Sequence, residues 1–550
     1  MLPLRVALAQ VNLTVGAIEA NAQRVREETV RAKALGAQLV VFPELTLSGY
    51  PPRDLLLQQG FVQRCAQALA ALAAPADWSS GIAVVLGAPL PHAGPGRGLH
   101  NAAVVLQEGA ITVAHKILLP TYDVFDEDRY FDPGAAPRSV VVAGVRVGLA
   151  ICEDAWNDKL YWQRTRYERD PVAELAREGV DLLVTLNASP YAIGKPRWRE
   201  ALLGAVARRH HLPLVYVNQV GGNDALLFDG HSACVDAAGT VFARAPAWKE
   251  KLLLSASAGP PAPLPADGSA DEAEQILEGL TLGVRDYLRK TGFRGALLGL
   301  SGGVDSALTA VIAARALGAS AVRGVSLPTR YNLAISEDDA LALARNLGCA
   351  YEVLPIERLR AVFLDELSGH FHGGKVALAE ENLQPRLRAT ALMALSNESD
   401  LLLLNTGNKS ELAMGYCTLY GDMAGALAVI GDLTKTQVYR LARHVNRGGE
   451  VIPARTLERP PSAELREGQR DQDTLPPYEV LDEIVRLAVE EQRAAADIVA
   501  VGFEAALVRE VLGRLGVAEY KRRQAPPILR VTERAFGEGW RFPLAQGFFE

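Results

Sequence analysis

Short apolar runs bounded by turn residues alternate with amphipathic segments along the first half of the chain. The segment 20–37 places its apolar residues at helical spacing, and VVLQEGAITVAHK has the form of a β-hairpin. The apolar runs are RVALAQV, AQLVVFPEL, GIAVVLGA, NAAVVLQ, VRVGLAIC, DLLVTLNA and LPLVYVN. This alternation predicts mixed β-sheets that are covered by helices.

In the second half, the apolar runs are separated by longer helical segments. The runs are GALLGL (295–300), AVRGVSL, AYEVLPI and DLLLLNT. Strands that alternate with helices in this way predict a doubly wound parallel sheet, which binds ligands at the carboxyl ends of its strands. Two stretches without such a pattern, 369–375 and 447–477, are expected to be long loops, and loops of that length are usually functional or mobile.

The stretch between the halves, 255–274, is rich in Pro, Ala, Gly and Ser and lacks either pattern. Such a composition is typical of a linker. A chain of 550 residues also exceeds what one hydrophobic core usually supports. We therefore expect a first domain at 1–256, a linker at 257–271 and a second domain at 272–550.

Composition and charge narrow the classes of function. The formal net charge of −7 argues against a large nucleic-acid footprint, and no apolar run approaches the roughly 18 residues of a membrane span. The start of the chain reads as a first strand and not as a signal peptide. The isolated cysteines indicate a reducing cytoplasm and argue against a structural zinc site. They are Cys65, Cys152, Cys234, Cys349 and Cys417.

The hexapeptide SGGVDS, at 301–306, follows the run GALLGL and opens a helical segment. Such a loop can cradle phosphate, because glycines allow close backbone approach and N–H groups at the helix N-terminus face the anion. Asp305 suits Mg²⁺, which prefers oxygen ligands and bridges to phosphate oxygens. The spacing differs from that of a Walker A loop. SGGVDS resembles the pyrophosphate loop of the ATP pyrophosphatase family, which implies adenylation of a substrate by ATP.

Three residues of the first half could perform amide hydrolysis. Glu44 in FPEL, Lys116 in HKILLPTY and Cys152 in CED each follow a predicted strand. A cysteine is a good nucleophile when a base takes its proton and a cation stabilises the developing charge. Glu44 could be that base, and Lys116 could supply the cation. In isolation, each would be read as a core cysteine or a solvated loop charge.

Together, these three contexts resemble the nitrilase, or carbon–nitrogen hydrolase, family over about residues 3–255. The resemblance implies a four-layer α-β-β-α sandwich. It also implies attack on an amide or nitrile carbon through a thioester. Glu127 is a candidate for a second glutamate that positions the reactants in this family.

The flanking segments, such as NASPYAIGKPRWR and YVNQVGGNDALLFDGHS, resemble the glutaminase domain of the NAD synthetase family. By this resemblance, Tyr122, Ser189 and Lys195 hold the α-amino and α-carboxyl groups of glutamine. Relatives often carry arginine at the position of Lys195, and an arginine fork binds carboxylate bidentately whereas lysine acts as a point charge. Further residues expected to line this pocket are Tyr50, Phe125 and Glu153.

The second half carries further segments that resemble the NAD synthetase family, such as NTGNKSELAMGY and GDLTKTQVYRLA, across about residues 272–545. The resemblance implies that ATP and Mg²⁺ activate the nicotinate carboxylate of deamido-NAD as an acyl adenylate, from which ammonia displaces AMP. The residues expected to bind ATP are Ser301, Gly302, Gly303, Val304, Asp305, Ser306, Thr406, Lys435 and Ser462. Those expected to bind deamido-NAD are Asn382, Glu411 and Lys521, with Asp305 and Glu411 as metal ligands.

The two halves fit one amidotransferase, in which glutamine hydrolysis at Cys152 delivers unprotonated ammonia to the adenylate. Amidotransferases that aminate GMP or aspartate share the pyrophosphate loop but normally lack a nitrilase-like glutaminase. A nucleic-acid thiolase would need a basic surface, and a non-catalytic nucleotide sensor would need a broken triad or loop. We therefore predict glutamine, ATP and deamido-NAD as substrates, and by the resemblance we expect a homo-oligomer.

Overall fold

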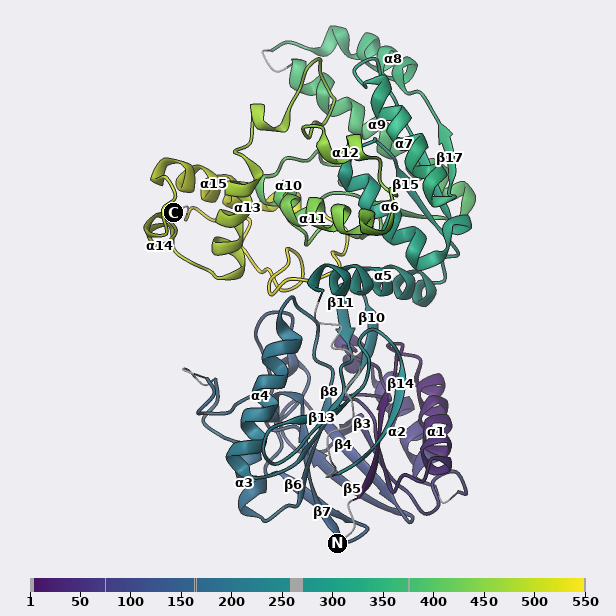
Figure 1. Ribbon diagram of the computed structural model, residues 1–550, viewed down its shortest axis with the longest axis vertical. Coiled ribbons are helices and arrows are strands. Elements are labelled where there is room, and N and C mark those ends of the chain that lie inside the picture. Colours follow the sequence, from purple (N-terminus) through teal and green to yellow (C-terminus); the bar gives the residue numbers. More distant parts are fainter. Residues whose placement is uncertain are drawn as a thin grey trace. The chain divides into compact units, whose positions relative to one another are not determined.

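The computed structural model describes residues 4–548 except 75, 163, 165, 258–270 and 374–375. The chain forms two compact units, Met1–Glu272 and Ala273–Glu550, drawn in purple to blue and in teal to yellow in Figure 1. The linker expected at 257–271 falls almost wholly on residues outside this description and stays a prediction.

The first unit contains two six-stranded sheets. One has the strand order β14-β1-β2-β3-β4-β5, with β1, β2 and β3 parallel to one another and the other strands antiparallel to their neighbours. Its strands are β1 (Arg5–Gln10), β2 (Leu39–Val41), β3 (Ala83–Pro91), β4 (Leu99–Gln107), β5 (Ala110–His115) and β14 (Lys251–Ala256). The expected hairpin at VVLQEGAITVAHK is the β4–β5 pair, so this prediction is confirmed.

The other sheet has the order β13-β12-β9-β8-β7-β6, with a parallel centre formed by β7, β8 and β9. Its strands are β6 (Arg138–Val142), β7 (Val145–Ile151), β8 (Leu182–Asn187), β9 (Leu214–Asn218), β12 (Ala233–Val235) and β13 (Val241–Arg244). A two-stranded ribbon, β10 (Val220–Asn223) and β11 (Leu226–Asp229), follows β9. Nearly every strand residue in the parallel centre is buried, which is why these strands read as unbroken apolar runs.

Packing places these sheets face to face. Leu8 of β1 and Val184 of β8 belong to one buried cluster between the sheets. Because successive residues of a strand point to opposite faces, Ala7 packs with helices α1 and α2 and Leu183 packs with α3 and α4. These helices are α1 (Ile18–Ala34), α2 (Gln59–Ala73), α3 (Pro171–Arg177) and α4 (Lys195–His210). Figure 1 shows the resulting layers, and the predicted α-β-β-α sandwich is confirmed.

The second unit is built on a five-stranded parallel sheet with the order β17-β16-β15-β18-β19. Its strands are β15 (Ala296–Gly299), β16 (Val322–Ser326), β17 (Ala350–Val353), β18 (Leu402–Asn405) and β19 (Leu427–Ala428). The chain starts in the centre, runs to one edge and then returns to the other side. Strand order therefore reverses between β15 and β18, which is where ligands bind in doubly wound sheets. The predicted fold class of this half is confirmed.

Helices of the second unit surround this sheet, and one of them, α9, packs Leu387 and Leu392 against Leu297 and Leu403. The helices that follow or cover strands are α5 (Glu272–Thr291), α6 (Val304–Leu317), α7 (Ala334–Leu347), α8 (Glu357–Leu367), α9 (Val376–Ser399), α10 (Lys409–Met414) and α11 (Lys435–Val445). Four more, α13 (Tyr478–Val485), α14 (Ala495–Ala500), α15 (Ala505–Val517) and α16 (Glu519–Arg522), form the C-terminal part. The expected loop at 447–477 contains the short helix α12 (Ala454–Glu458).

Candidate active sites

Cys152 stands directly after β7, at the start of a 3₁₀ turn that spans Cys152–Ala155. Its φ angle is 44°, in the left-handed region that a non-glycine residue rarely adopts, and strain of this kind collects at functional sites. Asp154 of the same turn accepts N–H bonds from Ile117 (3.0 Å), Leu118 (2.8 Å) and Ile151 (3.1 Å). The turn that carries Cys152 is thereby tied to the segment that carries Lys116.

The side chain of Lys116 is buried between two carboxylates. Its Nζ lies 2.7 Å from Oε1 of Glu44 and 2.7 Å from Oε2 of Glu127. The structure thus brings Glu127 into direct contact with Lys116, which also contacts Glu44. Tyr50 donates its hydroxyl to Glu127 over 3.0 Å, which fixes the carboxylate from its other side.

Glu44 is held by two groups that the sequence did not single out. Nδ2 of Asn101 lies 2.8 Å from Oε1 of Glu44, and the backbone N–H of Ala188 lies 3.2 Å from its Oε2. Asn101 is on β4 and Ala188 follows β8. The carboxylate is therefore fixed by elements of both sheets.

Burial and charge together set the protonation of this site. Burial raises the pKa of the Cys152 thiol well above its usual value, the charge of Glu44 raises it further, and Lys116 opposes both. Burial acts to lower the pKa of Lys116, but Glu127 and Glu44 outweigh it and keep the ammonium charged. Burial also raises the pKa of Glu127, against the pull of Lys116. Because burial keeps the Cys152 thiol protonated, a base must take its proton as the thiol attacks.

The residues expected to recognise glutamine lie near this turn in two groups. Tyr122 donates its hydroxyl to Glu153, 3.0 Å from each carboxylate oxygen, and its ring meets that of Phe125 edge-on. Burial raises the pKa of Glu153. The guanidinium of Arg166, a residue that the sequence did not single out, lies 3.8 Å from the centre of the Tyr122 ring.

Lys195 and Ser189 form the second group. Nζ of Lys195 donates to the carbonyl of Pro190 over 2.7 Å and lies 5.5 Å from the ring centre of Trp156, the residue that ends the Cys152 turn. The backbone N–H of Ser189 donates to Oδ1 of Asn218 over 2.9 Å. These contacts fix the ammonium of Lys195 and the backbone of Ser189 in the stretch that follows β8, and Lys195 lies near the end of the Cys152 turn.

The second unit has a cavity of about 980 Å³ at the carboxyl ends of its strands. Of the residues expected to bind ATP or deamido-NAD, all but Gly302 line it. They are Ser301, Gly303, Val304, Asp305, Ser306, Asn382, Thr406, Glu411, Lys435, Ser462 and Lys521. Residues separated by up to about 220 positions in the chain are thereby gathered around one space, large enough for nucleotide ligands.

The loop 301–306 adopts the geometry that an anion cradle requires. Gly302 has a φ of 78°, and a Cβ at this position would lie 2.2 Å from the carbonyl oxygen of Ser336, so only glycine fits. Gly303 is the N-cap of α6, and Ser306 donates its hydroxyl to the Gly303 carbonyl over 3.1 Å. The hydroxyl of Ser301 lies 3.2 Å from that of Ser306, so the loop is ordered by its own side chains.

Asp305 meets the second half of the predicted site through two contacts. Its Oδ2 lies 2.5 Å from Nζ of Lys435, and its Oδ1 accepts a bond of 2.9 Å from Nδ2 of Asn408. Asn408 is the N-cap of α10 and shares a reciprocal capping box with Glu411. Lys435 also lies 3.8 Å from Glu411, so one ammonium stands between two carboxylates. Burial and the charge of Asp305 raise the pKa of Glu411, and Lys435 opposes them.

This pair of carboxylates fits Mg²⁺. The part of the chain that the structure describes contains no group of three or more His, Cys, Asp or Glu side chains suited to a metal ion. Mg²⁺, however, usually takes one or two protein carboxylates together with phosphate oxygens and water. Asp305 and Glu411 supply two carboxylates that line the cavity and repel each other, which fits a site of this kind.

The remaining predicted residues line the wall of the same cavity. Lys521 donates to the carbonyls of Gly415 and Cys417, each over 2.7 Å, and Asn382 accepts the hydroxyl of Thr418 over 2.9 Å. The hydroxyl of Ser462 donates to the Gln469 carbonyl over 2.6 Å. These bonds order the loop that follows α10 and the loop that follows α12.

Two further acids on this wall were not singled out from the sequence. Asp422 accepts the N–H of Thr418 over 2.6 Å, and burial raises its pKa to about 6. Asp471 accepts the hydroxyl of Tyr478 over 2.8 Å, and burial raises its pKa as well. Asp422 lies inside the region that carries the family resemblance, but its burial comes from packing with distant segments and could not be read from that position.

Within the described residues, no helix is both long and apolar enough to cross a lipid bilayer.

Comparison with known proteins yields one consistent result. A family model for carbon–nitrogen hydrolases matches residues 5–257, and one for NAD synthases matches residues 276–525. The glutamine-dependent NAD(+) synthetase of Synechocystis sp. is 47% identical over 552 aligned positions that cover 99% of each chain. That of Thermotoga maritima is 41% identical and covers 100% of this chain and 99% of its own.

A solved structure is similar over both units. It is the glutamine-dependent NAD+ synthetase of Acinetobacter baumannii in complex with adenosine diphosphate. It is 38% identical to this chain, superimposes with a TM-score of 0.77 and covers 98% of each chain. Both the order of the two units and their folds are therefore shared with this relative.

Proposed function

The chain belongs to the family of glutamine-dependent NAD(+) synthetases, and from this premise we propose how its residues perform the reaction. It is a carbon–nitrogen ligase that amidates deamido-NAD to NAD. Glutamine supplies the nitrogen, and ATP is cleaved to AMP and pyrophosphate. The observation that carries the assignment is the presence in one chain of a Glu-Lys-Cys site and a pyrophosphate-loop cavity.

The first unit releases ammonia from glutamine. The Sγ of Cys152 attacks the amide carbon while Glu44 takes the thiol proton. The carbonyl oxygen gains negative charge, which the ammonium of Lys116 stabilises. Glu44 then gives its proton to the amide nitrogen, ammonia leaves, and a thioester remains on Cys152. Water hydrolyses this thioester with Glu44 again as base, and glutamate is released.

Glu127 has a supporting part in this chemistry. It shares Lys116 with Glu44 and receives the Tyr50 hydroxyl, which supports a role in holding the ammonium in place. Because Lys116 has two anionic neighbours, it stays charged in a buried site. A charged and fixed ammonium stabilises the oxyanion without reorganising during the reaction.

Recognition of glutamine falls to groups on either side of the Cys152 turn. Glu153, which receives the Tyr122 hydroxyl, suits the α-amino group, and Lys195 suits the α-carboxylate. Ser189, Tyr50 and Phe125 complete the pocket. Many relatives carry arginine at the position of Lys195, and an arginine guanidinium binds a carboxylate through two hydrogen bonds. Lys195 binds it as a point charge, so recognition here depends less on bidentate geometry.

The second unit activates the carboxylate of deamido-NAD. The loop residues Ser301–Ser306 hold the ATP phosphates, with Thr406, Lys435 and Ser462 as further contacts. The nicotinate carboxylate attacks the α-phosphorus, pyrophosphate leaves, and an acyl adenylate forms. Ammonia then attacks the acyl carbon, loses a proton and displaces AMP. Asn382, Glu411 and Lys521, which line the same cavity, bind deamido-NAD.

Mg²⁺ would be held by Asp305 and Glu411. When bound, it spreads the negative charge of the phosphates and of the pyrophosphate that leaves. The protein's own part is to keep the two carboxylates apart and oriented. Asn408 does this by bonding Asp305 and capping the helix of Glu411, and Lys435 does it by contact with both.

We place the enzyme in the cytoplasm as a homo-oligomer, without a nucleic-acid partner. The isolated cysteines support the reducing compartment. Helix α8 supports self-association, because it exposes four large apolar side chains on one short helix. These are Leu359, Val362, Phe363 and Leu367.

One assay tests the function as a whole. The purified chain is incubated with ATP, Mg²⁺, glutamine and deamido-NAD, and the products are separated. We expect NAD, AMP, pyrophosphate and glutamate in equal amounts. ADP in place of AMP, or amidation of GMP or aspartate in place of deamido-NAD, would assign the chain to another chemistry.

A further inference from the structure

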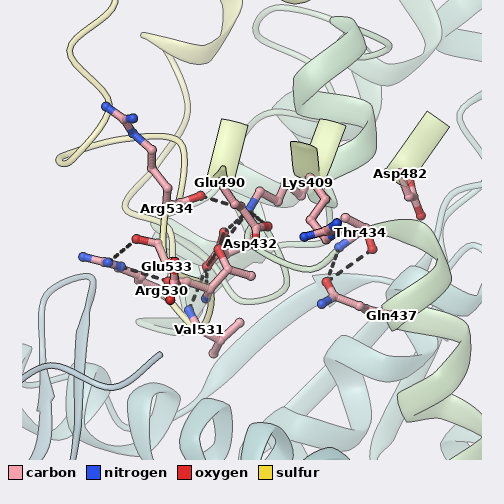
Figure 2. Close-up of polar contacts among 12 residues, drawn as sticks. Lys409, Asp432, Thr434, Gln437, Asp482, Glu490, Arg530, Val531, Glu533 and Arg534 are labelled. Atoms are coloured by element: carbon pink, nitrogen blue, oxygen red, sulfur yellow. Dashed lines mark hydrogen bonds and ion pairs between the residues drawn. The ribbon is translucent and has the colours of Figure 1, made fainter. Parts of the chain in front are cut away.

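Lys409 carries an ammonium that is completely buried in the second unit. Its Nζ lies 3.0 Å from Oδ1 of Asp432, 2.7 Å from Oε1 of Glu490 and 2.8 Å from the hydroxyl of Thr532. It also donates to the carbonyl of Arg534 over 2.9 Å. Figure 2 shows this ammonium enclosed by side chains from separate segments. Lysine is almost never fully buried unless it is paired in this way.

Lys409 belongs to a run of four residues in which each side chain has a different partner. Asn408 bonds Asp305 and caps α10. Ser410 donates its hydroxyl to Asp482 over 2.5 Å and accepts the backbone N–H of Lys435 over 2.9 Å. Glu411 is the second carboxylate of the predicted metal site. Lys409 lies between Asn408 and Glu411 in the sequence, and its fully buried side chain points into the protein interior.

Asp432 links the same ammonium to the helix that carries Lys435. It lies two residues before Thr434, the N-cap of α11, and the backbone N–H of Lys409 donates to the carbonyl of the next residue, Leu433, over 2.8 Å. Asp432 also accepts the backbone N–H groups of Val531 (2.8 Å) and Thr532 (2.7 Å). One carboxylate therefore joins α10, the start of α11 and the C-terminal segment.

The C-terminal segment is itself attached to the sheet. Ala428 of β19 donates to the carbonyl of Pro527 over 2.8 Å, and Leu529 donates to the carbonyl of Ala428 over 3.2 Å. This segment thus extends the edge of the sheet and carries Thr532 to the buried ammonium. A continuous series of hydrogen bonds and ion pairs therefore connects β19, through the C-terminal segment, Asp432 and Lys409, to α10.

A buried ion pair is poor evidence for stability, because desolvation of the charges can exceed their attraction. Helix α10 has only six residues, so its own hydrogen bonds cannot fix its orientation. Contacts outside the helix must therefore fix the position of Glu411 relative to Asp305. Lys409 makes such contacts at the residue that begins the helix, and they add to those of Asn408 and Ser410.

We propose that Lys409 is a positioning residue of the synthetase site. Through Asp432, Glu490 and Thr532 it fixes the start of α10, and so it holds Asn408 and Glu411 at the distance from Asp305 and Lys435 that the adenylation step requires. This inference rests on the proposed function, in which Glu411 acts on metal-bound ATP. It adds that the C-terminal segment is part of the support of that site.

A double-mutant cycle tests it with Lys409→Met, Glu411→Gln and the combined variant of the full chain. The readout is kcat for ammonia-supported NAD formation, with glutamine hydrolysis measured beside it. Each single change should lower kcat by about tenfold or more, and the combined variant should lie within about twofold of Glu411→Gln alone. Glutamine hydrolysis without synthetase ligands should stay unchanged in Lys409→Met.

Two further variants distinguish a loss of positioning from a loss of folding. Thr532→Val removes one hydroxyl from the network at constant shape, and it should lower kcat by roughly threefold in the wild-type background and not at all beside Glu411→Gln. Arg360→Met is the matched control, since Arg360 is also a buried cation, bound to Glu357 and Glu380 on α8 and α9. Its kcat should remain close to that of the wild type.

The possible outcomes test the positioning role of Lys409 separately from the role proposed for Glu411. If Glu411→Gln leaves kcat intact, the role proposed for Glu411 is wrong. Suppose instead that Glu411→Gln lowers kcat and that Lys409→Met and Thr532→Val lower it further by their full factors in that background. Lys409 is then a general stability residue, and the positioning role is overturned. The same conclusion follows if Arg360→Met lowers kcat as much as Lys409→Met does.

Discussion

Nζ of Lys435 lies 2.5 Å from Oδ2 of Asp305, a residue 130 positions earlier in the chain. This contact joins the start of α11 to the first turn of α6, just after the loop that follows β15. Asp305 therefore already has a cationic partner in the protein. A metal-bound nucleotide must share or displace that partner. Substitutions of Asp305 and Lys435 therefore test the synthetase site directly.

Asp305→Asn keeps the shape of the side chain and removes its charge. We expect NAD formation to fall by about a hundredfold or more with either glutamine or ammonia, because both depend on the adenylate. Glutamine hydrolysis should persist. The measurement is NAD and glutamate formed by the same preparation. Retention of ammonia-supported synthesis would show that this carboxylate has no part in ATP activation.

Lys435→Met leaves Asp305 and Glu411 facing each other without a cation. Breaking one partner of a buried pair is costly, but the cavity admits water, so we expect a loss of about 2–3 kcal/mol in the unfolding free energy of the second unit. Chemical denaturation measures it. Because carboxylates repel, Mg²⁺ at millimolar concentration should restore part of this stability to the variant more than to the wild type. An equal Mg²⁺ effect on both proteins would contradict the proposed metal site.

Much of the candidate site could be predicted because Glu44, Lys116, Cys152 and the loop at 301–306 each stand where an apolar strand ends. Their position alone did not assign a function to them, and the resemblance of the surrounding segments to known families did. The alternation of strands and helices predicted mixed sheets covered by helices in the first half and a doubly wound parallel sheet in the second, whereas the four-layer sandwich was implied by the family resemblance. What local pattern cannot supply is the partner of a charged residue that comes from a distant segment.

Lys409 illustrates this limit. A lysine next to a helix N-terminus is normally a solvated charge, yet its partners come from 23 to 125 positions later in the chain. Asn101 and Asp422 were missed for the same reason, since each gains its role from long-range contacts. Only the three-dimensional packing of these segments reveals that the side chains are buried.

Lys195→Met tests the proposed hold on the glutamine α-carboxylate. Loss of a charge-assisted hydrogen bond costs about 1.5–3 kcal/mol, so KM for glutamine should rise by roughly tenfold to a hundredfold. Ammonia-supported synthesis should not change. Lys33→Met, which removes an exposed ammonium from α1, is the control. A KM within about twofold of the wild-type value would assign the carboxylate to another residue, and Arg166 beside Tyr122 would be the next to replace.

Asp422 gives a pH dependence with a definite sign. Its folded-state pKa is raised to about 6 by burial, whereas an unfolded aspartate titrates near 3.9. Between these values the folded state holds a proton that the unfolded state releases, so this group's contribution to stability falls as the pH rises from about 4 to about 6.

Asp422→Asn should remove that decline. Between pH 5 and pH 7.5 the wild type should lose about 1 kcal/mol more unfolding free energy than the variant. Denaturation curves of both proteins at the two pH values provide the comparison. The account of Asp422 as a buried, partly protonated acid fails if the two proteins change in parallel.

The central claim is that one chain divides the reaction between Cys152, which releases ammonia, and the cavity around Asp305, which consumes it. The most direct measurement is the rate of NAD formation by Cys152→Ala with glutamine and, separately, with ammonium chloride at alkaline pH. The account predicts no glutamine-supported synthesis and ammonia-supported synthesis close to the wild-type rate. Equal loss of both activities would contradict it.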